Sequence, residues 1–143
     1  MIQTIYVELP IEKIAYLARP EFMNGPEQSF RNALTASMSK YGFRDPVYCV
    51  YNNSSYGNII KIIVGNNRMV VAKELKIPIV PAIITNYNAD QFPLEGRVLT
   101  TDDEIRALFH LPHHEKLHIR RDKNGDIDQV TPPHFPTVKQ HYV

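Results

Sequence analysis

Cysteine and tryptophan are nearly missing from this sequence, which has one Cys49 and no tryptophan in 143 residues. A lone cysteine cannot form an internal disulfide, so we expect a reduced, cytoplasmic setting rather than a disulfide-stapled secreted domain. Long apolar runs are also missing, because Lys61, Gly65 and Pro78 interrupt the longest candidates. No basic segment followed by an apolar core opens the chain. We therefore expect neither a membrane span nor secretion by the usual signal.

Charge of one sign is scarce as well. The formal net charge is only +1, whereas a dedicated DNA-binding domain usually carries a strongly basic face. Residues 1–85 hold nine Lys or Arg against six Asp or Glu, and residues 86–143 hold seven against nine. This asymmetry favours an anionic ligand for the first part of the chain and gives DNA only weak support.

What is present is the pattern of a small globular domain. Hydrophobic residues make up 43% of the chain and charged residues 22%, as in ordinary soluble proteins. Alternating and helical periodicities predict the order β-α-β-β-α-β, with strands at 4–8, 46–51, 59–64 and 79–85 and helices at 27–41 and 66–76. The apolar face of the first helix is expected to be Phe30, Leu34, Met38 and Tyr41. The strand at 59–64 is almost wholly apolar and is expected to be buried on both faces.

The tail changes character after residue 86. Thr101 and Glu104 form a capping box that predicts a short helix through Phe109. Segments 117–121 and 126–130 are expected to pair as a hairpin across Asn124-Gly125. The predicted fold is therefore α+β: a small mixed β-sheet with two packed helices in a domain at 1–86. A C-terminal extension at 87–143 adds a short helix, a β-hairpin and a Pro-rich end.

The turn Gly65-Asn66-Asn67-Arg68 joins an apolar strand directly to a helix. Such a turn points backbone N–H groups and the positive end of the helix dipole at one place. Glycine lets an anion approach the backbone, asparagines can cap the helix or donate hydrogen bonds, and an arginine can clamp phosphate oxygens. The same pattern is also a common way to turn a chain, and an arginine there is often only solvated.

Several segments resemble one known superfamily, in the right order. The run from Gly65 to Leu75 and the strand after it resemble the Gly-x-x-Arg motif, helix and trailing strand of ParB N-terminal domains. The other matching segments are Leu9–Ile14, Leu34–Gly42, Asp45-Pro46-Val47 and the Arg19-Pro20 pair found in sulfiredoxins. Residues 1–86 thus resemble the ParB/sulfiredoxin-like superfamily.

The resemblance implies a nucleotide as ligand. In that superfamily the Gly-x-x-Arg turn generally binds phosphates, of ATP in sulfiredoxin and of CTP in chromosome-partitioning ParB, and Mg²⁺ can accompany either. Carried over position by position, the resemblance implies that the phosphates are surrounded by Gly65, Asn66, Asn67 and Arg68. It implies Arg19 and Ser37 as flanking contacts. Arg19 also fits a plain surface charge, and Ser37 a plain polar helix position. Small free-standing copies of the fold often belong to phages and mobile elements, which implies such an origin here.

Two departures argue against the best-known activities. Sulfiredoxin chemistry uses a cysteine at the position of Asn66, and an amide cannot form the sulfur intermediates that a thiolate forms. Cys49 lies in the preceding strand, where a lone cysteine is usually a small buried hydrophobe. Partition ParB proteins carry a further motif and a helix-turn-helix after the nucleotide turn, whereas residues 86–99 show no helical periodicity.

The main interpretation is a nucleotide-binding module with a regulatory or partner-binding role. One alternative is an enzyme: a metal-dependent nuclease acting on DNA, or a nucleotide hydrolase or phosphotransferase. Its candidate catalytic carboxylates are Glu8 and Asp45, with Glu12 nearby, and each also fits a solvated or capping residue. Another alternative is an interaction protein with a disused nucleotide site, whose extension docks a protein partner or a second copy.

Two features of the tail imitate metal sites. Four histidines cluster at His110, His113, His114 and His118, but Pro112 interrupts the helix and no cysteine completes a zinc site. Residues 122–128 resemble the start of a calcium loop, yet Ile127 occupies the position that requires glycine. We therefore predict no metal site and a plain hairpin turn.

Overall fold

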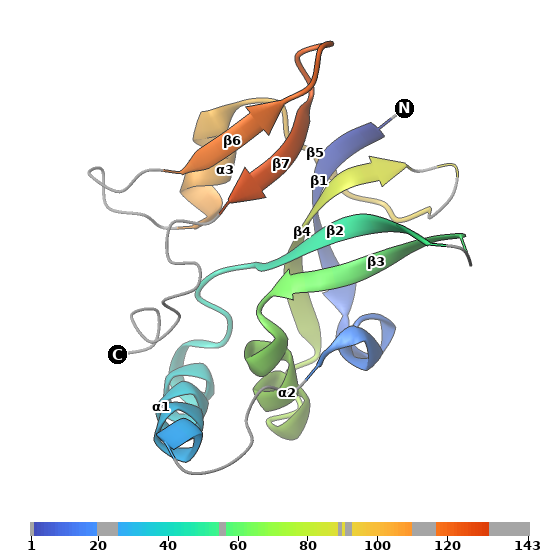
Figure 1. The fold of residues 1–143 in the computed structure, drawn as a ribbon. Coiled ribbons are helices and arrows are strands. Elements are labelled where there is room, and N and C mark those ends of the chain that lie inside the picture. The colour runs from blue at the N-terminus through green and yellow to red at the C-terminus, as the bar shows by residue number, and fades with distance from the viewer. Residues whose placement is uncertain are drawn as a thin grey trace.

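The structure is a computed structural model that describes residues 2–19, 26–54, 57–88, 90, 93–109 and 117–131. Within these residues a five-stranded sheet has the order β3-β2-β4-β1-β5, and a separate two-stranded sheet pairs β6 with β7 (Figure 1). The strands are β1 (Ile2–Pro10), β2 (Val47–Ser54), β3 (Gly57–Val64), β4 (Ile79–Asn88), β5 (Arg97–Val98), β6 (His118–Arg121) and β7 (Ile127–Thr131). The helices are η1 (Ile11–Lys13), η2 (Ala15–Leu17), α1 (Pro26–Tyr41), α2 (Asn66–Glu74) and α3 (Asp102–Leu108).

The sheet is mixed, as the sequence predicts. β4 pairs antiparallel with β1 and parallel with β2, while β3 and β5 pair antiparallel with their neighbours. β4 runs parallel to β2 because the chain reverses twice between them, once at the β2–β3 hairpin and once through α2. The α+β class and the order β-α-β-β-α-β are confirmed.

One face of the sheet packs against η1, η2 and α2. Alternate residues of four strands supply this face because side chains along a strand point to opposite sides with a period of two. Its buried members include Ile14 before η2, Met69 of α2 and, from the sheet, Leu9, Cys49, Ile60, Ile62 and Ala82. α1 packs on the outer side of α2, where Leu34 and Met38 meet Val71 and Ala72. Figure 1 shows α1 and α2 together at the bottom of the view.

The other face of the sheet is covered by α3 and the hairpin β6–β7, which Figure 1 shows at the top of the view. Thr4 of β1 donates its hydroxyl to the Ile127 carbonyl at 2.7 Å. The hydroxyl of Tyr48 in β2 accepts the Val130 N–H at 3.0 Å and lies 3.0 Å from the Thr85 hydroxyl. Burial raises the pKa of Tyr48, so the phenol stays neutral and can serve both partners. Apolar contacts and buried hydrogen bonds therefore hold the hairpin on the sheet.

The predicted helix and hairpin of the tail are confirmed, whereas its Pro-rich end lies outside the described residues. Thr101 caps α3 by accepting the Glu104 N–H, and the Glu104 carboxylate reaches back to the Thr101 N–H at 3.1 Å. Hydrogen bonds to its carboxylate, first from the Thr101 hydroxyl and then from the N–H groups of Thr100 and Thr101, lower the pKa of Glu104. In the hairpin turn the Asp122 carboxylate accepts the N–H groups of Asn124 and Asp126, at 2.8 and 3.0 Å. The carboxylate thus closes a turn of the protein's own backbone.

Two expectations about single elements were wrong. β3 is an edge strand, and its Lys61 and Ile63 are only half-buried, because the chain adds it outside β2. Tyr41 is 58% exposed because α1 ends there and turns through Gly42, whose φ is +67°.

The boundary predicted at residue 86 lies inside β4, which continues to Asn88. β5, from the predicted extension, pairs with β1 of the main sheet. The division into two units stays a prediction. None of the helices that the structure describes has the length and apolar character needed to cross a membrane.

Candidate functional site

The predicted phosphate turn lies where β3 ends and α2 begins. Gly65 is the N-cap of α2 with φ +110°, and the helical ladder starts with the Met69 N–H on the Gly65 carbonyl at 2.9 Å. A Cβ on Gly65 would lie 2.7 Å from Val47 Cγ1 and 3.1 Å from Arg68 Nη2. Glycine is therefore required here by its positive φ and by close packing, whatever ligand the turn holds.

Arg68 is buried beneath this turn, with only 3% of its surface exposed. Its Nη1 donates to the backbone carbonyls of Asp45 at 2.6 Å and Pro46 at 3.2 Å. The guanidinium therefore fixes the segment that leads into β2. The sequence predicts either a phosphate contact or a solvated side chain for Arg68, and neither includes this role. No local pattern announces this contact, because its partners are main-chain atoms about twenty positions earlier in the chain.

The structure brings Asn66 and Arg19 together. The Asn66 side-chain oxygen accepts the Arg19 N–H at 2.7 Å, and its amide nitrogen donates to the Ile62 carbonyl at 3.3 Å. The Asn66 side chain thus ties the end of the η2 segment to β3 rather than capping α2. The Arg19 side chain is exposed beside the turn.

The remaining predicted binding residues lie on the helices. Asn67 occupies the first turn of α2 and is half-buried. Ser37 is half-buried on α1, the helix that packs against α2 and is linked to it by an ion pair between Arg31 and Glu74. Contacts of Asn67 and Ser37 with a nucleotide stay a prediction.

The two predicted catalytic carboxylates lie in different surroundings. Asp45 is half-buried, and its backbone carbonyl is held by Arg68 at the turn. Glu8 is exposed on β1, where its carboxylate accepts the Tyr6 hydroxyl at 3.2 Å. It lines an open hollow of about 410 Å³ together with Phe43 and Pro81, among others. A catalytic role for either carboxylate stays a prediction.

Cys49 is fully buried in β2, and burial raises its pKa to about 12. We expect no reaction of the folded protein with a thiol-specific disulfide reagent at pH 8, and full reaction in denaturing urea. Because the folded-state pKa lies above that of an exposed thiol, Cys49 stabilises the fold fully up to about pH 9. That contribution is lost as the pH rises toward 12. Rapid labelling under native conditions would contradict this placement.

The predicted absence of a metal site concerns mainly the histidine cluster. His110, His113 and His114 lie outside the described residues, and His118 is exposed on β6. Within the described ranges, no group of three or more His, Cys, Asp or Glu side chains is placed to hold a metal ion.

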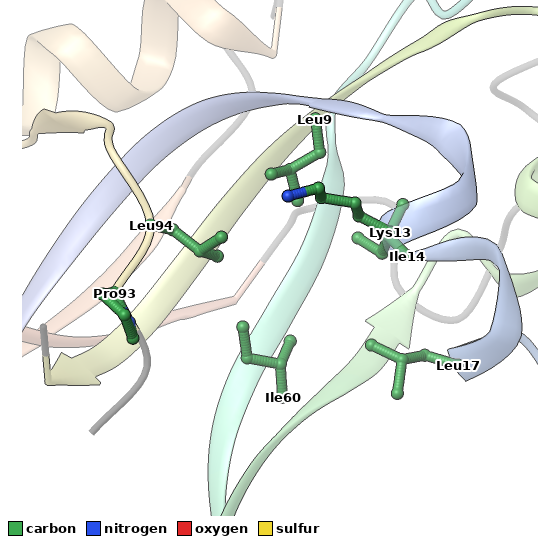
Figure 2. Close-up of a pocket in the computed structure, with 7 residues that line it drawn as sticks. All are labelled: Leu9, Lys13, Ile14, Leu17, Ile60, Pro93 and Leu94. Atoms are coloured by element: carbon green, nitrogen blue, oxygen red, sulfur yellow. The ribbon is translucent and has the colours of Figure 1, made fainter.

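A second hollow, of about 330 Å³, was not predicted from the sequence. It lies between β1, β3, the η1–η2 segment and the loop after β4, as Figure 2 shows. Its lining residues are Leu9, Lys13, Ile14, Leu17, Ile60, Pro93 and Leu94. They come from three separate stretches of the chain (9–17, Ile60 and 93–94), and each alone has the pattern of an ordinary core or loop residue. We call this hollow the Lys13 pocket.

Comparison of the sequence with known protein families and with curated proteins finds no match. Among solved structures, the fold is similar to sulfiredoxin from Arabidopsis thaliana, with a TM-score of 0.40 and 19% identity over 60% of this chain and 90% of that one. It is also similar to a Pnob8-like ParB-N domain, with a TM-score of 0.40 and 19% identity over 64% of this chain. The aligned part spans only 34% of that second chain. These are the two groups that the sequence motifs resemble, and likenesses this distant carry no inference about activity.

Proposed function

We propose that this protein is a nucleotide-binding module that holds phosphate groups at the start of α2, between the Gly65–Arg68 turn and Arg19. The observation that carries the proposal is the hydrogen bond from the Arg19 N–H to the Asn66 side chain, 2.7 Å long. This hydrogen bond fixes the backbone of the exposed Arg19 beside the N-terminus of α2. Arg19 and Asn66 are 47 positions apart in the sequence.

The charges around this place favour an anion. The N-terminal end of α2 carries the positive end of the helix dipole. The Arg68 guanidinium lies beneath it, fixed on two neutral carbonyl oxygens. The exposed Arg19 side chain adds a second guanidinium, and a guanidinium presents donors in a geometry that matches phosphate oxygens.

The side chains at the turn favour binding over covalent chemistry. Asn66 is an amide whose oxygen and nitrogen both make hydrogen bonds within the protein. An amide is not a nucleophile of the kind that forms phosphoryl intermediates. A regulatory module that responds to bound nucleotide fits this arrangement, and ATP and CTP are the ligands to test first.

Thermal unfolding with ATP, CTP or inorganic pyrophosphate, each with and without Mg²⁺, tests the proposal. A ligand at a hundredfold excess over its dissociation constant stabilises the folded state by about 2.7 kcal/mol, which raises the melting temperature by several degrees. In Arg19→Ala we expect this shift to fall by more than half, while the melting temperature without ligand stays unchanged because the side chain is exposed.

Arg97→Ala is the matched control. Arg97 is also exposed, but it lies on β5 at the opposite edge of the sheet from β3. Its variant should keep the full ligand shift. Equal loss in both variants would indicate nonspecific attraction of anions, and no shift with any of the three ligands would overturn the proposal.

A further inference from the structure

We propose that the Lys13 pocket binds a small amphipathic acid, with its apolar body in the pocket and its carboxylate on the Lys13 ammonium. The pocket volume of about 330 Å³ lies at the lower end of the range for small-molecule sites, which are mostly apolar with a few polar groups. The site is separate from the phosphate turn and does not depend on it.

The pocket is apolar apart from one charge. Ile14 and Ile60 are buried at 1% and 3% exposure, and Leu17 and Leu94 are half-buried at the sides. Figure 2 shows the Lys13 side chain extending across the pocket, with its nitrogen on the side of Leu9. Within the described residues, Lys13 takes part in none of the ion pairs, which join Arg31, Arg120 and Arg121 to carboxylates.

This arrangement selects the class of ligand. A wholly apolar ligand would cover the ammonium and remove its water without replacing the lost hydrogen bonds, which is costly. A ligand with a carboxylate replaces them and pairs the charge. A nucleobase fits poorly, because its ring edge carries several donors and acceptors and the lining offers only one ammonium among apolar side chains.

Both walls of the pocket are fixed before any ligand arrives. On one side, the Ile11 N–H donates to the Pro78 carbonyl at 2.9 Å, which holds η1 against the start of β4. On the other side, the buried hydroxyl of Tyr87 accepts the Leu94 N–H and contacts the Leu94 carbonyl at 3.3 Å. A preformed pocket binds a ligand without the entropy cost of ordering its walls.

Titration calorimetry of the full chain with octanoate and with 1-octanol tests the proposal. We expect octanoate to bind more tightly than the alcohol of the same length. Lys13→Gln should weaken the affinity for octanoate by about fivefold, which corresponds to the loss of one ion pair. The affinity for 1-octanol should stay unchanged. The side chain is exposed, so this variant should fold normally.

Two further variants complete the experiment. Lys73→Gln removes an exposed lysine from α2 and should leave both affinities unchanged. Leu17→Trp fills the pocket and should weaken both ligands by at least tenfold. Failure of both ligands to bind the natural chain would overturn the proposal. Equal weakening of octanoate in the two lysine variants would also overturn it, because the attraction would then belong to the surface as a whole.

Discussion

A chain that ends at Val98 is expected not to fold. The removed part contributes Leu99, Ile105, Phe109, Ile127 and Val130 to the second face of the sheet, each at most 5% exposed. Burying five such side chains is worth on the order of 10 kcal/mol, which equals the whole stability of a typical domain. Far-UV circular dichroism and urea unfolding of the shortened chain measure this directly.

The matched control is a chain that ends at Thr131, which keeps every residue of that apolar cluster. We expect it to unfold at the same urea concentration as the full chain. If the chain ending at Val98 is folded and unfolds cooperatively, residues 1–98 are an independent domain. In that case α3 and the β6–β7 hairpin are not needed for its stability. That outcome would support the division at residue 86 predicted from the sequence.

Replacing Arg68 by methionine is expected to destabilise the protein by about 3 kcal/mol. Methionine keeps much of the volume but leaves the carbonyls of Asp45 and Pro46 without the Nη1 donor that now reaches them. A buried carbonyl without a donor, as that of Pro46 would be, costs about 1–3 kcal/mol, and the half-buried Asp45 carbonyl adds a smaller amount. The midpoint of urea unfolding should fall accordingly.

Arg44→Met is the control for this change. Arg44 lies in the same segment but is exposed, with its guanidinium 5.4 Å from the ring centre of Tyr41. Its replacement should cost less than about 1 kcal/mol. An unchanged midpoint in Arg68→Met would show that the carbonyl contacts contribute little. Because Arg68 supports the turn itself, loss of nucleotide binding in its variants does not identify a direct contact, and Arg19→Ala is the cleaner test.

The elements that could be predicted are those with local causes. The capping box at Thr101 and Glu104, the left-handed Gly42 and the Asn124-Gly125 hairpin all depend on residues within a few positions of one another. Each is present in the structure. Helix α1 was also predictable, because most of its apolar residues repeat with the helical period.

The parts that could not be predicted depend on distant partners. The edge position of β3 follows from which strand pairs beside which, and an apolar composition does not decide that. The role of Arg68 depends on two main-chain oxygens of another segment. The Lys13 pocket depends on the meeting of three stretches of chain that are distant in sequence. At the turn, the resemblance named Asn66 and Arg19 as separate candidate phosphate contacts. Their hydrogen bond, and the use of the Asn66 side chain as a tie between segments, were not predicted.

The hydrogen bond from Thr4 to Ile127 joins residues 123 positions apart, and this has a consequence for the order of folding. The β2–β3 hairpin closes a short loop, whereas β1 must wait for β4, since Ile2 pairs with Asn88. Contacts of long sequence separation form slowly because the chain between them loses entropy first. During synthesis, the first strand therefore leaves the ribosome long before its partners. Its buried side chains Ile5, Val7 and Leu9 stay exposed to chaperones and to other chains until α2 and β4, which pack against them, have been made.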